Sequence, residues 1–420
     1  MFSPEEAAFI DRIREDNADD LPRLIYADWL DEHGHQPRAD FIRVQCALAK
    51  MAEDDPNTET LRMYENSLLE SYSDEWTQKI GQIVEGLSFR RGMIEAVTVT
   101  PRQFLAIGEN GYQRYPIRRF RLVELGESAP KIFQSPLMRF VVELDFSQST
   151  LDGFRCATVA RARHLRNLEW LDLGFTGIDH MALTMLLHSP VMSRLKTLRL
   201  VENRTINADS LRAILTSEHL SELETLDLSG NLMTSRDLDV LLREFDALPN
   251  LKFIHLQGNR LGVGIREFAN SMLMDQLVKH DPELNLSSNE IASEGVEELV
   301  ESPPFSKVKT LILDQNPVRD SGLSHLIRSF NTRNLQTIGL VNCGLSDDSI
   351  REMANSPLMG RLQKLDLRGN LITRESVDRL QEMSRRKLSG GTLTIKTDDE
   401  LLTSRPSLSS LLWQMQRRES

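Results

Sequence analysis

In this chain of 420 residues, few groups of residues could take part in catalysis or ligand binding, and none has the spacing of a known catalytic motif. The phosphate-loop pattern G-x-x-x-x-G-K-[ST], the nucleophile-elbow pattern G-x-S-x-G and the zinc-protease pattern H-E-x-x-H do not occur in the sequence. The cysteines Cys46, Cys156 and Cys343 lie too far apart for a zinc finger or a disulfide framework. The sequence therefore predicts a protein that is not an enzyme, with no catalytic residue, no metal and no cofactor.

Two short segments contain residue types that occur in ligand sites. His33 and His35, with Asp31 and Asp40 nearby, could outline a metal site, although a helix end followed by a solvated turn explains the same residues. Gly262-Val-Gly264 lacks the preceding buried strand, the third glycine and the later acidic residue of a dinucleotide site. We interpret it as the turn that begins a helix.

The composition is that of a globular protein with an acidic surface. Hydrophobic residues make up 40% and charged residues 27%, and 50 Lys and Arg stand against 62 Asp and Glu, for a net charge of −12. This balance favours a partner with a basic surface and disfavours nucleic acid and anionic membranes. No signal peptide and no stretch of about 20 apolar residues is visible. We therefore expect a soluble, reduced, cytoplasmic protein, monomeric and without contact to a membrane.

An internal repeat determines the expected architecture. The pattern L-x-x-L-x-L-x-x-N/C-x-L recurs at spacings of 27–30 residues along most of the chain. Clear copies begin at Leu168, Leu195, Leu223, Leu251, Val308, Leu335 and Leu362, weaker ones at Val141 and Asp281, and degenerate opening strands at Ile94 and Ile117. The one spacing of 30 predicts a small insertion at residues 278–282.

Each position of the pattern has a structural reason. In a short parallel strand the second and third leucines point to the same side, so stacked copies form a continuous apolar wall. At the N/C position a short polar side chain can satisfy backbone groups that would otherwise be buried without a partner. The predicted ladder consists of Asn203, Asn231, Asn259, Asn289, Asn316, Cys343 and Asn370. Cys343 is thus interpreted as a ladder residue and not as a nucleophile.

Between the strands the apolar period changes to that of a helix, and each helix begins with a residue suited to cap it. Such segments begin at Asn207, Thr234, Asp320, Ser346 and Thr373. On these patterns, the region from about Ile94 to Ile395 resembles leucine-rich repeat proteins of the ribonuclease-inhibitor-like class. The resemblance implies an α/β solenoid, a horseshoe with a parallel sheet on its concave side, helices on its convex side and capped ends.

The N-terminal region follows other rules. Ser3-Pro-Glu-Glu6 has the spacing of a helix start. The strings DDLPRLIYADWL (19–30) and FIRVQ (41–45) closely resemble the repeat-companion domain of certain bacterial proteins, a small all-helical module that precedes repeat arrays. The resemblance implies a bacterial origin but no activity.

These patterns predict a division into four parts. Residues 1–52 form the helical module, 53–92 a helical bridge and N-terminal cap, 93–395 the solenoid, and 396–420 a C-terminal cap or tail. In the last part, Pro406 and the apolar residues from Leu408 to Met415 predict a final helix, which would cap the last repeat or dock a partner.

The concave side of the sheet is the surface left for function. Repeat positions three, five, seven and eight face outward, and identical positions on neighbouring strands lie ~4.8 Å apart. The predicted protein-binding residues are Trp170, Asp172, Phe175, Arg199, Glu202, Asp227, Phe253 and His255. Exposed aromatic residues beside an arginine are typical of interface anchors. In the alternative interpretation, the charges neutralise one another along the row and the curvature shields the aromatic rings.

A second patch has the opposite charge. It comprises Arg90, Arg91, Arg114, Arg118, Arg119 and Arg121, interleaved with Tyr112 and Tyr115. Such a patch suits nucleic acid. The acidity of the whole chain makes pairing with acidic residues of the N-terminal module the simpler interpretation.

We therefore expect a non-enzymatic protein-binding scaffold that recognises its partner by shape and charge complementarity. One alternative is a regulator of an enzyme, similar to the leucine-rich repeat GTPase activators. Another is a structural role, with self-assembly through the end caps.

Overall fold

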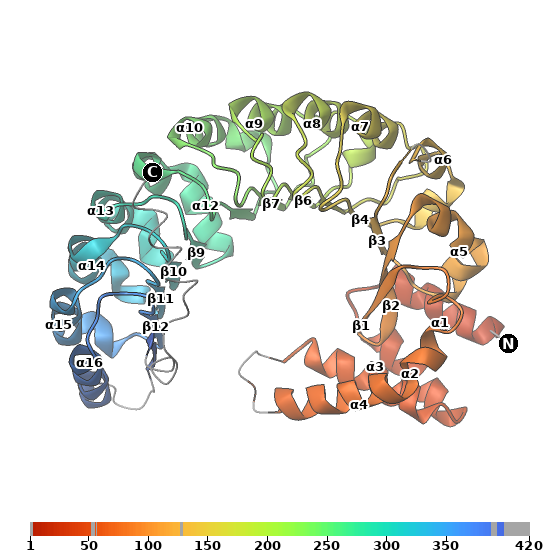
Figure 1. The fold of residues 1–420 in the computed structure, drawn as a ribbon, viewed down its shortest axis with the longest axis horizontal. Helices are drawn as coiled ribbons and strands as arrows, with labels where there is room; N and C mark the ends of the chain where they lie inside the picture. The colour runs from red at the N-terminus through yellow and green to blue at the C-terminus, as the bar shows by residue number, and fades with distance from the viewer. Residues whose placement is uncertain (1–2, 52–54, 56, 127–128, 388–392, 399–420) are drawn as a thin grey trace, which may run out of the picture. The chain divides into compact units, whose positions relative to one another are not determined.

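The computed structural model describes residues 3–51, 55, 57–126, 129–387 and 393–398 (Figure 1). The helix predicted at 406–415 lies outside these residues. The contacts between residues divide the chain into two compact units. Unit 1 comprises residues 1–205, 216–224 and 248–250, and unit 2 comprises residues 206–215, 225–247 and 251–420.

Unit 1 begins with helices and continues with strands that alternate with helices (Figure 1). Its elements are α1 (Pro4–Glu15), α2 (Leu21–Glu32), α3 (Gln36–Leu48), α4 (Thr58–Thr77), β1 (Gly86–Arg90), β2 (Met93–Val99), α5 (Pro101–Arg114), β3 (Arg119–Leu122), α6 (Ala129–Phe133), η1 (Pro136–Phe140), β4 (Glu143–Asp145), α7 (Gly153–Ala160), β5 (Trp170–Asp172), α8 (His180–Leu187), η2 (Pro190–Met192) and β6 (Thr197–Arg199). From β2 to β6 each strand pairs in parallel with the next, and α7 and α8 lie on one side of them.

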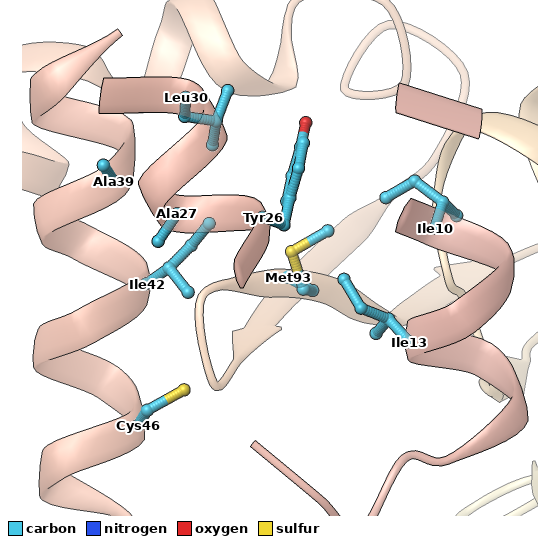
Figure 2. Close-up of a cluster of buried hydrophobic side chains, with 9 residues drawn as sticks. All are labelled: Ile10, Ile13, Tyr26, Ala27, Leu30, Ala39, Ile42, Cys46 and Met93. Carbon is cyan, nitrogen blue, oxygen red and sulfur yellow. The ribbon is translucent and has the colours of Figure 1, made fainter. Parts of the chain in front are cut away.

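The first three helices form their own small core. α1 begins with the predicted capping box, in which Ser3 and Glu6 exchange hydrogen bonds. Figure 2 shows the buried cluster that these helices share. Its members are Ile10, Ile13, Tyr26, Ala27, Leu30, Ala39, Ile42, Cys46 and Met93. Met93 belongs to β2, so the core of the helices continues into the first strand of the parallel series.

The bridge predicted as helical over 53–92 is helical only in part. α4 covers Thr58–Thr77, but Gly86–Arg90 form β1, which pairs antiparallel with β2. The prediction was wrong for this end of the bridge, because the segment alternates apolar and polar residues in the period of a strand. The tight turn of the hairpin contains Arg91 and Gly92, both with positive φ.

Unit 2 repeats the strand and helix alternation. Its elements are α9 (Ala208–Leu215), β7 (Thr225–Asp227), α10 (Ser235–Glu244), η3 (Phe245–Ala247), β8 (Phe253–His255), η4 (Gly262–Gly264), α11 (Ile265–Ala269), α12 (Met272–His280), β9 (Glu283–Asn285), α13 (Ser293–Glu301), η5 (Pro303–Lys307), β10 (Thr310–Ile312), α14 (Arg319–Arg328), η6 (Phe330–Asn334), β11 (Thr337–Gly339), α15 (Asp347–Asn355), η7 (Pro357–Gly360), β12 (Lys364–Asp366), α16 (Arg374–Lys387) and β13 (Thr394–Lys396). β7 pairs with β8, and β9 to β13 form a second parallel sheet.

The leucines of the pattern form the interior of both units. Leu144, Leu171 and Leu198 in unit 1 have no exposed surface, and the same holds for Leu311 and Ile338 in unit 2. Since each repeat has one apolar wall and cannot bury it alone, burial depends on stacking against the neighbouring repeat. The predicted α/β fold of parallel strands and helices is confirmed.

Candidate functional site

The register of unit 1 brings the outward residues of four strands together. At position three, Arg119 on β3 pairs with Glu143 on β4, which pairs with Trp170 on β5. At position five, Asp145 on β4 pairs with Asp172 on β5, and this residue pairs with Arg199 on β6. We call these outward residues of β3 to β6 the strand face of unit 1.

The two aspartates of this face are held in the same way. An Oδ1 atom accepts a backbone N–H two residues on, from Ser147 to Asp145 at 2.8 Å and from Gly174 to Asp172 at 2.8 Å. Each Oδ2 atom accepts from an arginine, Arg119 at 2.6 Å and Arg199 at 2.7 Å. Both residues are 4% exposed, so their carboxylates support the turns and orient the two arginines.

Their pKa values move in opposite directions. At Asp145 burial opposes ionisation, but hydrogen bonds from Ser147 and Arg119 outweigh it and lower the pKa. At Asp172 burial prevails over the hydrogen bond from Gly174 and the charge of Arg199, and the pKa is raised. The physical difference includes the nearby charge of Asp145, which disfavours a second carboxylate beside it.

Trp170 is the aromatic centre of the strand face of unit 1. The Arg119 guanidinium lies over its ring, with Cζ 4.2 Å from the ring centroid, while the same side chain bonds Asp145. The ring also lines a pocket of about 350 Å³ between β1 and β5. Its lining includes Phe89, Arg90, Arg118 and Glu143. Trp170 is half-buried, with the Arg119 guanidinium against its ring.

Phe175 follows β5 at position eight. It is 56% exposed, and its φ of 57° is in the left-handed region. The same position has a positive φ in the other repeats, where it is often occupied by glycine or a small polar residue. These residues are Gln148, Glu202, Gly230, Gly258, Ser288, Gln315, Asn342 and Gly369. A bulky aromatic residue is unfavourable in this conformation, so packing elsewhere in the repeat must impose it.

In unit 2 the predicted site residues lie on β7 and β8. Asp227 is 7% exposed and accepts from the backbone N–H and the hydroxyl of Ser229, at 3.1 and 2.5 Å. It pairs in register with His255, which is exposed, and Phe253 beside it is half-buried. The structure therefore places Trp170, Asp172, Phe175, Arg199 and Glu202 together in unit 1, and Asp227, Phe253 and His255 together in unit 2.

Phe253 and His255 line a cleft of about 270 Å³ where the pairing of unit 2 is interrupted. β8 and β9 belong to different sheets. In the next two repeats, the residue just before the strand donates its backbone amide to a carbonyl of the preceding repeat. Lys309 donates to Pro282 at 2.8 Å, and Gln336 donates to Lys309 at 2.8 Å. Pro282 occupies this position in its own repeat and has no N–H to donate. The break coincides with the predicted insertion at 278–282.

The asparagines form the hydrogen bonds expected of a ladder. Nδ2 of Asn316 donates to the carbonyls of Leu286 and Leu313, each at 2.9 Å, and Oδ1 accepts from the amides of Asn289 and Ile291, each at 2.9 Å. Asn203, Asn231, Asn259 and Asn370 donate to carbonyls in the same way. Asn289 differs, because its Oδ1 is buried and has no partner among the described residues. The ladder is therefore incomplete beside the β8–β9 break.

Cys343 lies in the ladder and is buried, with Sγ 3.2 Å from the carbonyl of Leu313. Burial raises the pKa of its thiol to about 12, so the sulfur is a neutral thiol at neutral pH.

Three of the four residues of the possible metal site, His33, Asp31 and Asp40, have other partners. The His33 ring stacks on Trp29 with centroids 4.1 Å apart. Asp31 and Asp40 both pair with Arg43. Within the described ranges, no group of three His, Cys, Asp or Glu side chains could hold a metal ion. Gly262–Gly264 form the short helical turn η4.

The arginines of the second patch bond to several parts of unit 1. Arg91 reaches the N-terminal helices, with bonds to the carbonyls of Asn17 and Ala18 at 3.1 and 3.0 Å and to Asp20 at 3.5 Å. Others pair within the repeats, Arg90 with Glu143 at 3.4 Å and Arg121 with Gln148 at 3.0 Å. Tyr112 is buried against Phe104 and Phe120, whereas Arg114 lies over the ring of Tyr115.

Sequence reasoning assigned Arg119 and Trp170 to different patches, but the fold brings them together. Both occupy position three of their repeats, and this shared position was the available signal. The reasoning also missed Arg23 on α2 and Glu95 on β2, which form a buried ion pair with side chains 0% and 3% exposed.

Comparisons with known proteins agree with the repeat pattern. A leucine-rich repeat family model matches residues 283–300. Toll-like receptor 2 of Boselaphus tragocamelus is 26% identical over 277 residues, which are 61% of this chain and 33% of that protein. Ribonuclease inhibitor of Sus scrofa is 30% identical over 238 residues, 54% of this chain and 51% of that protein. The chain thus spans a third to a half of the length of these relatives.

Among solved structures, the crystal structure of the Rad7 and Elc1 complex in yeast aligns with a TM-score of 0.35 and 14% identity, over 89% of this chain and 96% of that chain. The matches to the repeat model, to Toll-like receptor 2 and to ribonuclease inhibitor support leucine-rich repeats in the matched parts of this chain. The matched relatives are a receptor and an inhibitor. Among the described helices, none combines the length and the apolar character that a membrane crossing requires.

Proposed function

We propose that this protein is a non-enzymatic scaffold that binds a protein partner through its strand face, the side that the repeat resemblance places on the concave surface. The observation that carries the proposal is Trp170 with Arg119 over its ring and Asp145 behind the arginine. Because Asp145 is buried, its ion pair with Arg119 holds the exposed part of this cluster in one conformation. A rigid aromatic group beside oriented charges loses little entropy on binding.

Phe175 extends this surface. Its exposure and its left-handed backbone place an apolar ring in solvent at a position where smaller residues would be easier to accommodate. In unit 2, Phe253 and His255 provide a second aromatic and polar pair at the rim of the β8–β9 cleft. The net charge of −12 supports a partner whose surface is basic.

The experiment compares partner capture by matched variants. Purified wild-type chain, the double variant Trp170→Ala with Phe175→Ala, and the control Phe154→Ala are used as bait in lysate of the source organism. Phe154 is 65% exposed but lies on α7, away from the strands. For a protein that both the wild type and the control capture, the recovered amount should be about tenfold lower with the double variant. Equal recovery by all three baits would remove the strand face from the proposal.

A second candidate function is the regulation of an enzyme, and the similarity to ribonuclease inhibitor favours it. The test adds the purified chain in excess to a pancreatic ribonuclease and, separately, to a GTPase captured with it. Inhibition of the first or stimulation of the second, lost in the Trp170→Ala and Phe175→Ala double variant, would support this function. Unchanged rates in both assays would exclude it for these enzymes.

We further propose that residues 1–52 are a repeat-companion module whose role is to close the N-terminal end of the repeats, in a cytoplasmic bacterial protein. The Arg23–Glu95 pair and the place of Met93 in the helical core support a fixed attachment. In this proposal residues 53–92 continue the cap, 93–395 are the solenoid and 396–420 complete its other end.

A further inference from the structure

A groove of about 970 Å³ lies on unit 1 away from the strand face. It is formed by the loops that lead from α7 to β5 and from α8 to β6. Its lining includes Arg161, Arg163, His164, Arg166, Pro190 and Val191. None of the residues assigned to the strand face of unit 1 lines it, so the groove is independent of the function proposed above.

The charge of the groove opposes that of the chain. Four arginines and no carboxylate line it, in a protein with a net charge of −12. One of the four, Arg194, lies 3.8 Å from a carboxylate oxygen of Glu169. Arg161, Arg163 and Arg166 are exposed, and among the described residues they form no ion pair with a carboxylate. On the strand face of unit 1, in contrast, Arg119 and Arg199 are both paired with aspartates. Clustered arginines without counter-charges repel one another unless an anionic ligand neutralises them.

The shape of the groove is fixed by one hydrogen bond between two repeats and three hydrogen bonds within them. The Ser189 hydroxyl donates to the carbonyl of Ala160 at 2.6 Å and accepts from the amide of Val191 at 3.3 Å. The amide of Leu165 donates to Ala162 at 2.9 Å, and Arg166 Nε donates to the carbonyl of Arg163 at 3.0 Å. These bonds hold the arginine-bearing loop in one conformation, which lowers the entropy lost on binding.

The wall between the arginines is apolar. Ala160, Pro190 and Val191 contribute to it, and no Phe, Tyr or Trp lines the groove. Single-stranded nucleic acid is usually held by several aromatic rings that stack on its bases, and the groove offers only the imidazole of His164. An apolar wall with a basic rim instead complements a peptide that carries acidic residues on one side and aliphatic residues on the other.

We propose that this groove docks an acidic, amphipathic segment of a partner protein. The Arg161, Arg163 and Arg166 guanidiniums pair with its carboxylates, and the wall formed by Pro190 and Val191 receives its aliphatic side chains. The groove is a second interaction surface on unit 1, and its occupant has a charge opposite to that expected for a partner of the acidic chain as a whole.

The test measures binding of a defined probe to the full chain by fluorescence anisotropy. The probe is a labelled peptide of alternating Glu-Glu and Leu-Leu pairs, and its counterpart has Lys in place of Glu. The groove variant combines Arg161→Glu, Arg163→Glu and Arg166→Glu. The matched control combines Arg62→Glu, Arg102→Glu and Arg204→Glu, which are also exposed and have no carboxylate partner among the described residues. Both variants therefore have the same net charge.

We expect the acidic probe to bind wild type and control within about twofold of each other and the groove variant at least about tenfold more weakly. The Lys counterpart should not bind wild type or control at this site, and Val191→Asp should weaken the acidic probe while leaving the melting temperature unchanged. Equal weakening by groove variant and control would overturn the proposal, since binding would then follow net charge alone. Tighter binding of an oligouridylate, lost in the groove variant, would overturn it in favour of nucleic acid.

Discussion

The N-terminal helices with their hairpin and the repeats are stabilised in different ways. The repeats bury leucines at fixed spacing and satisfy their turns with asparagines that recur in successive copies. The N-terminal region depends on contacts that occur once. Arg38 lies over Phe41, Trp76 and Phe89, with Cζ 4.8 Å from the Trp76 ring centroid, and Arg23 pairs with Glu95 in the interior.

Burial shifts the pKa of one arginine and of one glutamate in this region. Burial lowers the pKa of Arg38 to about 10, which still leaves the guanidinium charged at neutral pH. Burial also raises the pKa of Glu95, although the charge and hydrogen bond of Arg23 oppose the rise. Loss of the partner of a buried charge is strongly destabilising. A repeat residue, in contrast, has equivalents in the other copies of the repeat. The difference predicts where single substitutions are most damaging.

The largest effect is expected at the buried ion pair. Arg23→Met leaves Glu95 without its partner and should lower the free energy of unfolding by about 3–5 kcal/mol. Chemical denaturation followed by far-UV circular dichroism measures it. The control Arg12→Met removes an exposed pair with Glu15, whose side chains are 68% and 67% exposed, and should have little effect. Equal stability of both variants would mean that the N-terminal region tolerates loss of a buried charge.

A smaller loss is expected at the hairpin turn. Gly92 has a φ of +81°, and a Cβ built there would lie 2.5 Å from the Ile42 backbone. Gly92→Ala should therefore cost about 2–4 kcal/mol, from backbone strain and a clash with α3. Gly177→Ala is the matched control, since φ is +65° but no atom lies within 4 Å. If both variants melt at the same temperature, the close approach to Ile42 contributes nothing.

The smallest effect is expected within the repeats, between two asparagines of the ladder. Asn316→Ala removes both donor and acceptor bonds, whereas Asn289→Ala removes donor bonds only, because its Oδ1 has no partner. We expect the first variant to be less stable than the second by about 1–2 kcal/mol. Urea unfolding of the two proteins provides the difference. An equal loss at the two positions would contradict an incomplete ladder beside the β8–β9 break.

Much of the fold follows from the sequence because the repeats are local. Each copy carries its own leucines, turn residue and helix start, so β5, β10 and β12 lie where the pattern places them. The hairpin strand β1 was not predicted, because the residues before Ile94 belong to no repeat and their alternation is short. The candidate site was predicted only as a set of outward positions. Its internal bonds depend on side chains from strands that are far apart in sequence.

The sequence by itself determined that this chain stacks strand and helix units, since periodic apolar residues can be buried in no other way. It also determined the N/C positions, because each inward turn needs a polar side chain. Only the tertiary structure decided that Arg119 lies over Trp170, that Arg23 reaches Glu95 and that the loop arginines border an apolar groove. These contacts join residues from separate elements, and their geometry depends on how close the packed backbones come to one another.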